Sequence, residues 1–314
     1  IGDEAFNFCG SLTEINVDED NEFYSNDYSG VLFDKEKTTL IQYMNGNVST
    51  SYLIPDCVKV IGTYAFSCCA NIENIVIPNN VVIIEKSAFA GCNYLESLIF
   101  LDGVTTIGDY AFADCSNLKS VTIPESVISI ENYAFSSCYN LEQAIISNGV
   151  VNIGEGVFDS CEKLVSVTIP KTVKTMGCGV FFGCENLKEI NYCGTETEWN
   201  EIVIAELDEY IAKQKKRGFA NIKEFQIEYH QRIAMSFAAF ILTVIGVSLS
   251  ARKVKGGIGL YLGIGLALSF SYILFQTISS TFAVNGNTPP FIAVWIPNIL
   301  YTFIAIYLYR KAPK

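Results

Sequence analysis

The sequence predicts a solenoid of 23-residue repeats followed by an all-α membrane domain of three helices. Three observations predict it: a strict internal repeat, two long uncharged stretches near the end of the chain, and a reversal of charge between the two parts. Residues 1–204 hold 28 acidic residues and nine Lys, a net charge of −19, whereas residues 205–314 hold five acidic and twelve basic residues, a net charge of +7. We therefore expect two domains in different surroundings, over residues 1–204 and 205–314.

The repeat is marked by Ala or Val followed by Phe, with Cys three residues after the Phe. The motif occurs six times at a spacing of 23, with its aromatic residue at Phe66, Phe89, Phe112, Phe135, Phe158 and Phe181. A unit this small cannot bury its own apolar face, so like residues must stack on like residues in one continuous core.

Each unit is predicted to contain a short parallel strand. Residues 118–124 alternate apolar and polar side chains and end at Pro124, which is typical of a strand. The segment around residues 109–112 is more compact and predicts a turn or a short helix on the opposite side. The period is interrupted at about residues 21–46, where Gly30 and the apolar residues after it predict an irregular hairpin inserted in the stack.

Strand positions that point away from the core form the candidate ligand-binding surface. This strip is neutral and lightly apolar, so we expect it to bind a protein or a glycan, although an ordinary solvated sheet surface explains it equally well. Nucleic acid is not an expected partner, because the acidic repeats repel phosphate. The candidate residues are Val76, Ile99, Thr122, Ile145 and Thr168.

All eleven cysteines lie in the first part of the chain, and no Cys-x-x-Cys pair is present. Because free Cys packs well as a small buried apolar residue, we interpret the six that share one column as structural thiols. The single histidine, His230, lies far from them, so no metal site is expected. The column consists of Cys69, Cys92, Cys115, Cys138, Cys161 and Cys184.

Motifs for catalysis are missing from the sequence. There is no nucleotide-binding loop, no nucleophile elbow and no His-Glu metal motif. We therefore expect no catalytic residue, no cofactor and no enzyme activity.

The repeat columns resemble the BspA-like leucine-rich repeats, whose units read as Ile-Pro, Val, Ile-Gly, Ala-Phe, Cys and Leu. Gly30 to Phe33 and the ending from Tyr192 to Trp199 are similar to that family as well. The resemblance covers about residues 1–203. It implies a leucine-rich-repeat solenoid with a recognition or adhesion surface, often at the cell surface, and it implies no catalytic residue.

The uncharged stretches cover residues 233–251 and 256–309. A transmembrane helix needs about 20 apolar residues, and the second stretch is long enough for two, divided by a turn at residues 285–290. We therefore predict a lipid bilayer as partner and three transmembrane helices at about 230–250, 258–282 and 291–309.

Three residues of this part are singled out. Gly259 and Gly263 have the small-xxx-small spacing that lets helices approach closely in lipid. Arg232, at the start of the first span, is suited either to contact a lipid phosphate or to anchor the helix by snorkelling.

A second resemblance covers about residues 205–314. The runs Glu228 to Ala234, Lys253 to Gly257 and Trp295 to Asn298 are similar to the fourth to sixth helices of the LptF/LptG family of lipopolysaccharide-export permeases. The resemblance implies the bacterial inner membrane, a periplasmic repeat domain and a cytoplasmic C-terminus, an orientation that the basic residues alone leave undecided. It also implies lipopolysaccharide, a homologous permease subunit and a separate ATPase subunit as partners.

Three functional hypotheses follow. The first is a transport component that carries a recognition domain in place of the first permease helices. The second is a membrane-anchored module that binds or adheres to protein or glycan and has no transport role. The third is that the joint near Ile204 and Ala205 is a fusion or an assembly artefact of two unrelated proteins.

The chain begins inside the repeat pattern, at Ile1, so we interpret it as a fragment or a mature form.

Overall fold

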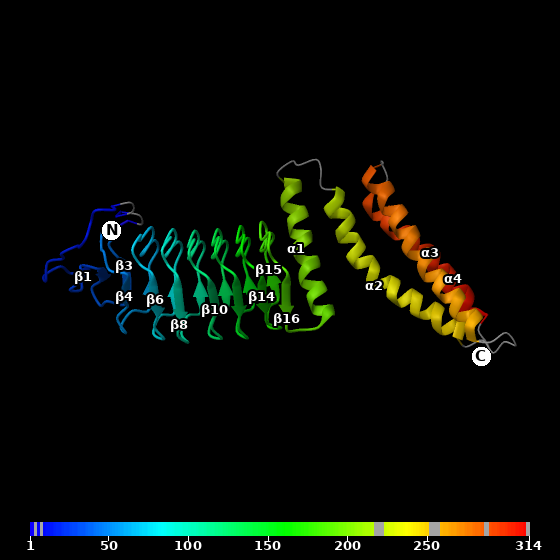
Figure 1. Ribbon diagram of the computed structural model, residues 1–314, viewed down its shortest axis with the longest axis horizontal. Helices are drawn as coiled ribbons and strands as arrows, with labels where there is room; N and C mark the ends of the chain where they lie inside the picture. The colour runs from blue at the N-terminus through cyan, green and yellow to red at the C-terminus, as the bar shows by residue number, and fades with distance from the viewer. Residues whose placement is uncertain (3–4, 7–8, 217–222, 251–257, 286–288, 312–314) are drawn as a thin grey trace. The chain divides into compact units, whose positions relative to one another are not determined.

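The computed structural model describes residues 1–2, 5–6, 9–216, 223–250, 258–285 and 289–311. The chain divides into two compact units, Ile1–Glu206 and Leu207–Lys314. The first unit is a solenoid of stacked turns, and the second consists mainly of long helices (Figure 1). The predicted fold class is therefore confirmed.

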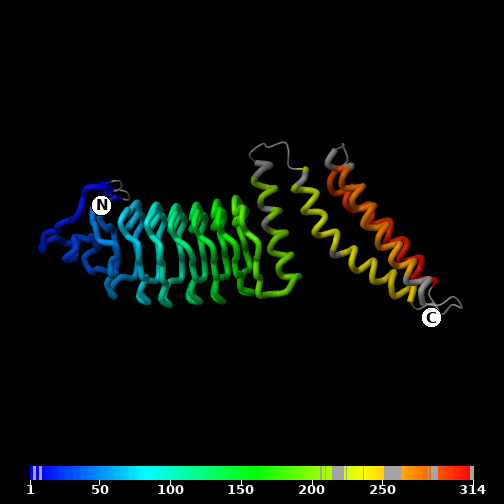
Figure 2. The backbone as a smooth tube through the Cα atoms, viewed as in Figure 1, coloured from blue at the N-terminus to red at the C-terminus, as the bar shows by residue number. Residues whose placement is uncertain are grey.

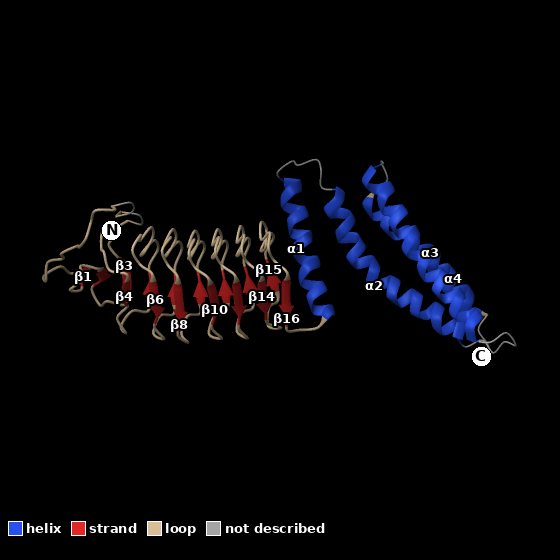
Figure 3. Cartoon of the chain, viewed as in Figure 1, coloured by secondary structure: helices blue, strands red, loops and turns tan. Residues whose placement is uncertain are grey.

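One side of the solenoid is a row of short parallel strands, one from each turn (Figure 3). Side chains along β6 and β10 are alternately exposed and buried, as the sequence pattern predicts for a half-buried strand. The ladder of backbone hydrogen bonds is interrupted between β8 and β10, so the row forms a three-stranded and a four-stranded sheet. The strands are β4 (Ser51–Leu53), β6 (Asn74–Ile77), β8 (Ser97–Phe100), β10 (Ser120–Ile123), β12 (Gln143–Ile146), β14 (Ser166–Ile169) and β16 (Glu189–Tyr192).

A second sheet, which was not predicted, runs along another side of the solenoid. Its repeat strands have only two residues each: β5 (Val60–Ile61), β7 (Ile83–Ile84), β9 (Thr106–Ile107), β11 (Ser129–Ile130), β13 (Asn152–Ile153) and β15 (Thr175–Met176).

The inserted segment continues this second sheet. It forms three antiparallel strands, and the last of them pairs in parallel with β5. The insertion therefore extends the sheet at its N-terminal end. Its strands are β1 (Tyr24–Asn26), β2 (Leu32–Asp34) and β3 (Thr39–Gln42).

The remaining side of each rung consists of turns, including the segment around residues 109–112. These turns are bonded from rung to rung, for example from the Phe112 N–H to the Ala134 carbonyl at 2.7 Å. Two positions in a rung take a left-handed backbone, as at Tyr110 and Asp114, with φ angles of 57° and 58°. These left-handed residues let the chain turn sharply without a helix.

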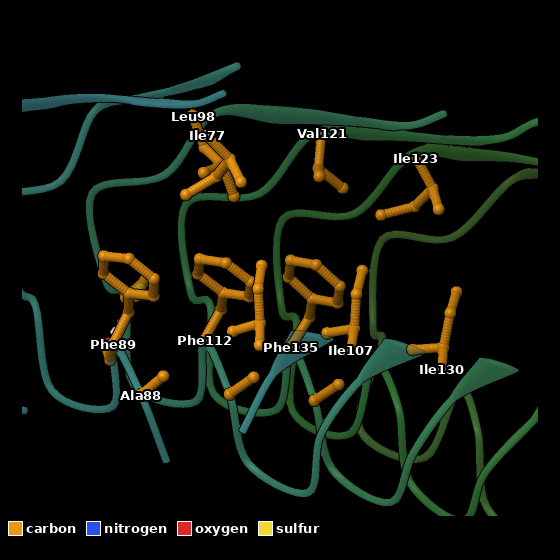
Figure 4. Close-up of a cluster of buried hydrophobic side chains, with 14 of the residues drawn as sticks. Ile77, Ala88, Phe89, Leu98, Ile107, Phe112, Val121, Ile123, Ile130 and Phe135 are labelled. Atoms are coloured by element: carbon orange, nitrogen blue, oxygen red, sulfur yellow. Dashed lines mark hydrogen bonds between the residues drawn. The ribbon is translucent and has the colours of Figure 1, made fainter. Parts of the chain in front are cut away.

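The core of the first unit is an aromatic column with aliphatic columns beside it. Figure 4 shows Phe89, Phe112 and Phe135 in a row, one ring from each rung, with Ile107 and Ile130 on the same row. The Phe112 ring centroid lies 5.0 Å from that of Phe89 and 5.2 Å from that of Phe135, and the rings are nearly parallel. The strict period of the sequence thus becomes one continuous stack.

Helix α1 (Glu196–Lys216), which was not predicted, follows the last strand (Figure 2). Its first turn is a capping box, because the Thr195 N–H donates to Glu198 Oε2 at 2.8 Å and the Glu198 N–H donates to Thr195 Oγ1 at 3.3 Å. Trp199 and Ile202 then pack against the repeat core. The start of α1 therefore covers the apolar end of the stack, as terminal segments of solenoids must.

Helix α1 also runs without interruption through residues 204 and 205. The predicted domain boundary after Ile204 thus lies inside a helix, two residues before the end of the first compact unit at Glu206. Beyond that point, the Tyr210 ring lies 4.8 Å from the Phe225 ring, and both residues belong to the second unit.

The second unit contains three long helices that pack on one another. They are α2 (Lys223–Ser250), α3 (Ile258–Asn285) and α4 (Pro290–Arg310), and each contains the corresponding predicted span. Their segments long and apolar enough to cross a membrane are Phe225–Ser250, Gly263–Thr281 and Pro290–Arg310. Side chains such as Ile241, Tyr272 and Tyr301 fill the space between them.

Candidate recognition face and intramembrane polar cluster

The five predicted ligand-binding residues lie in one row on the long-strand side of the solenoid. Val76 is opposite Ile99, and Thr122, Ile145 and Thr168 are opposite one another on successive strands. Val76 and Ile99 are 42% and 50% exposed and Thr122 is exposed, whereas Ile145 and Thr168 are half-buried. Because β-branched side chains have few rotamers, the row is a stiff surface.

The row continues at its N-terminal end to Leu53, which pairs in register with Val76 and is 85% exposed. Leu53 is not among the predicted binding residues, although it lies 23 residues before Val76, which is the spacing of the repeat. Polar residues lie beside the row at the equivalent position of each strand, for example Asn74, Ser97 and Ser120.

Exposed carboxylates border the first rungs of this row. Glu73 and Glu96 precede the strands on one side, and Asp56 and Asp102 follow the strands on the other. Lys119 Nζ bonds to Glu96 Oε2 at 3.0 Å, but both side chains are more than half exposed, so the pair contributes little to stability. The first rungs therefore combine an aliphatic strip with an acidic border.

The thiol column faces the interior, and each thiol makes a specific contact. The Cys92 S–H donates to the Phe66 carbonyl at 3.1 Å. The same contact recurs for Cys115, Cys138, Cys161 and Cys184, each with the Phe carbonyl 26 residues earlier. A thiol is thus small enough for the column and also satisfies a carbonyl that Ala would leave without this donor.

Three thiols of this column, those of Cys69, Cys115 and Cys184, ionise less readily than an ordinary thiol. Burial raises the pKa of Cys69 and Cys115 well above the ordinary range, and burial also raises the pKa of Cys184 to about 12. All eleven cysteines are free. Among the residues that the structure describes, no group of three or more His, Cys, Asp or Glu is arranged to hold a metal ion.

A polar cluster links the three helices of the second unit. Asn298 of α4 is 2% exposed, its Nδ2 donates to the Ala234 carbonyl of α2 at 2.8 Å, and its Oδ1 accepts from the Tyr272 hydroxyl of α3 at 2.7 Å. Ser271 and Tyr301 share a further hydrogen bond between α3 and α4. The sequence offered one signal for this cluster, an Asn inside an otherwise apolar span.

We expect Asn298→Leu to destabilise the second unit by about 1–2 kcal/mol, because it leaves the buried Tyr272 hydroxyl without its acceptor. The loss is measured by thermal unfolding of the full chain in a nonionic detergent. Thr277→Val is the matched control, since the exposed Thr277 hydroxyl bonds only within α3, to the Ile273 carbonyl. Equal stability of the two variants would show that Asn298 does not hold the helices together.

The other residues singled out in this part are placed as follows. Arg232 is bound to Glu228 at 2.7 Å on the same face of α2, and its side chain is 34% exposed. Gly263 lies on an exposed part of α3, where an added Cβ would meet nothing within 4 Å. Gly259 lies one turn earlier on α3. Packing at Gly263 against another helix and a lipid contact by Arg232 therefore stay predictions.

The geometry defines a membrane protein with a leucine-rich-repeat domain. A model of the BspA-type leucine-rich repeat region matches residues 1–106 and 82–207, so the chain belongs to that family. A model of the lipopolysaccharide export system permease LptF/LptG matches residues 154–311, and through this part the chain belongs to the permease family as well. The two matches overlap over residues 154–207, where the structure has the last rungs of the solenoid and the start of α1.

Solved structures similar to the chain are bacterial leucine-rich-repeat proteins. A leucine-rich cell surface protein from Faecalibacterium prausnitzii is 30% identical over 64% of this chain and 47% of its own, with a TM-score of 0.50. A leucine-rich-repeat protein from Treponema pallidum is 29% identical over 55% of this chain and 81% of its own, with a TM-score of 0.47. The chain thus spans about half the length of the first of these proteins. No curated protein matches it.

Proposed function

We propose that this protein is a membrane-anchored recognition protein. Its recognition row, the outward strand positions Leu53, Val76, Ile99, Thr122, Ile145 and Thr168, binds a protein or a glycan, and the helices hold the repeats at the membrane. The observation that carries the proposal is the row of stiff, exposed or half-buried, mostly aliphatic side chains on successive strands of the two long-strand sheets. The proposed role is binding without catalysis.

The test is site-specific photo-crosslinking in host membranes. A photoreactive residue at Ile99 reports on the recognition row, and one at Ile83, which is 39% exposed on the second sheet, is the matched control. We expect an adduct from Ile99 and none from Ile83. The adduct should persist when residues 217–314 are deleted, because the repeats with α1 keep their own core. Equal labelling from both positions would reject a specific face.

A second candidate function is transport of lipopolysaccharide, favoured by the permease match over residues 154–311. In that case the chain lies in the bacterial inner membrane, the repeats are periplasmic and the C-terminus is cytoplasmic. A homologous permease subunit and an ATPase subunit then co-purify with it from detergent-solubilised membranes. Isolation of the chain alone would count against transport and would favour the membrane-anchored recognition protein.

Orientation is tested by labelling with a membrane-impermeant maleimide in intact cells whose outer membrane has been permeabilised. Cys193 is exposed on the repeat unit, and no cysteine is present in the second unit. Labelling of Cys193 supports a periplasmic repeat domain, whereas labelling only after lysis places the repeats in the cytoplasm.

The continuity of the chain at residues 204 and 205 has a direct test, because trypsin cuts after Lys188 and Lys213. The peptide of residues 189–213 therefore crosses the joint. Its detection by mass spectrometry in host membranes would reject an assembly artefact, and detection of the flanking peptides without it would favour two separate proteins.

A further inference from the structure

Two properties of the recognition row occur together in its first three rungs. Leu53, Val76 and Ile99 are its most exposed aliphatic side chains, and Leu101, just after β8, is also 45% exposed. From the fourth rung onward the row changes to Thr122, a half-buried Ile145 and a half-buried Thr168. The part of the row that offers the most apolar surface is therefore its N-terminal half.

In the same half, the exposed carboxylates at the strand ends have no exposed lysine of the same rungs beside them. Glu73, Glu96, Asp56 and Asp102 are exposed at the two ends of the first strands. The lysines of these rungs, Lys59 and Lys86, lie by the second sheet and the turns, away from the row. From the fourth rung onward, exposed carboxylates continue at Glu125 and Glu142, but exposed lysines stand among them, at Lys119, Lys163, Lys171 and Lys188.

An exposed aliphatic surface framed by carboxylates selects its partner by chemistry. Burial of Val76 and Ile99 gains free energy only against another apolar surface. The carboxylates beside them attract cations, repel anions and raise the rate of encounter with a positively charged partner. A neutral glycan would form no ion pair with these carboxylates. A protein segment with aliphatic side chains between Lys or Arg residues would pack on the aliphatic surface and also pair with the carboxylates.

We infer that the N-terminal half of the row, Leu53, Val76 and Ile99 with Glu73 and Glu96, binds a basic protein segment whose central side chains are aliphatic. This inference rests on the proposed recognition function and names its partner class. The C-terminal half of the row, with Ile145 and Glu142, does not select for charge, because lysines stand beside it.

The experiment measures binding of short fluorescein-labelled peptides to the full chain in a nonionic detergent, by fluorescence anisotropy. The probe alternates Val and Lys. One comparison peptide has Glu in place of Lys, and another has Ser in place of Val. We expect the Val-Lys probe to bind at least about tenfold more tightly than either, with binding that weakens as salt is raised.

Two double variants test the residues, and a third is their matched control. We expect Val76→Ser with Ile99→Ser, and Glu73→Gln with Glu96→Gln, each to weaken the Val-Lys probe by about tenfold. Ile83→Ser with Glu36→Gln removes one exposed aliphatic side chain and one exposed carboxylate outside the row, and it should change the affinity less than about twofold. Circular dichroism of each variant establishes that the solenoid remains folded.

Two outcomes would overturn the inference. The first is a wild-type chain that does not prefer the Val-Lys probe. The second is an equal loss from the control variant, which would mean that the probe responds only to the overall acidic charge. Neither outcome would contradict the proposed function, which is tested separately by crosslinking from Ile99. A crosslink to a neutral glycan or an acidic protein would support recognition and would reject only the basic partner.

Discussion

Raising the pH above about 8.5 is expected to remove roughly 5–6 kcal/mol of stability from the repeat unit per pH unit. Four thiols carry the effect. Burial raises the pKa of Cys69, Cys115 and Cys184, and a hydrogen bond with Cys138 together with burial raises the pKa of Cys161. In the unfolded chain each thiol ionises near its ordinary pKa of about 8.5, so each one favours unfolding by about 1.4 kcal/mol per further pH unit.

The sign follows from the direction of the shifts. Because the folded pKa values are raised, the stability is fully present below the unfolded pKa and falls as the pH rises toward the folded values. A typical domain has only about 5–15 kcal/mol in total, so alkaline unfolding should begin within two or three pH units. Urea unfolding of the full chain in a nonionic detergent, followed by circular dichroism between about pH 8 and 10, measures the slope below the ordinary tyrosine pKa.

Single cysteine variants separate the thiols from other causes of alkaline unfolding. Cys115→Ala should reduce the slope of stability against pH by about a quarter, since it removes one of four contributing thiols. Cys57→Ala, at an exposed position, should leave the slope unchanged. The slope does not depend on the stability that Cys115→Ala loses through packing. An unchanged slope in Cys115→Ala would show that buried thiols do not govern the pH response.

Phe112→Ala is expected to destabilise the repeat unit by about 3–5 kcal/mol, the range found when a fully buried aromatic side chain is truncated. The Phe112 ring is fully buried and stacks on Phe89 and Phe135, and its edge contacts the Phe100 ring, with the centroids 5.8 Å apart. Its removal leaves a gap between two rungs. The rigid backbone ladder cannot close this gap, because each turn is hydrogen-bonded to the next.

A second phenylalanine provides the control for Phe112→Ala. Phe182 directly follows a member of the aromatic column, yet its own side chain is 73% exposed. We expect Phe182→Ala to change stability by less than about 0.5 kcal/mol. Both variants are compared by urea unfolding at neutral pH, followed by circular dichroism. A small loss in Phe112→Ala would show that neighbouring rings refill the column.

The period of 23 was sufficient to predict the stack, its aromatic column and the outward row. Any residue that recurs at this spacing must lie beside its equivalent in the next rung, so the sequence alone predicts that Val76 and Ile99 are neighbours. The second sheet was not predictable in this way, because strands of two residues, such as Val60–Ile61, are too short to show an alternation. Helix α1 is not predicted, because the resemblance to the repeat family ends at Trp199, inside the first turns of the helix.

The candidate sites also differ in whether a local sequence pattern or long-range packing decides them. The sequence by itself determined the solenoid, the three apolar spans and the charge difference between the parts, because each depends on a period or a composition that is local in the chain. Only the tertiary structure showed that the thiols donate to Phe carbonyls and that Asn298 joins α2 to α3. These contacts link residues 26 to 64 positions apart, whose relative placement is decided by packing and by no local pattern.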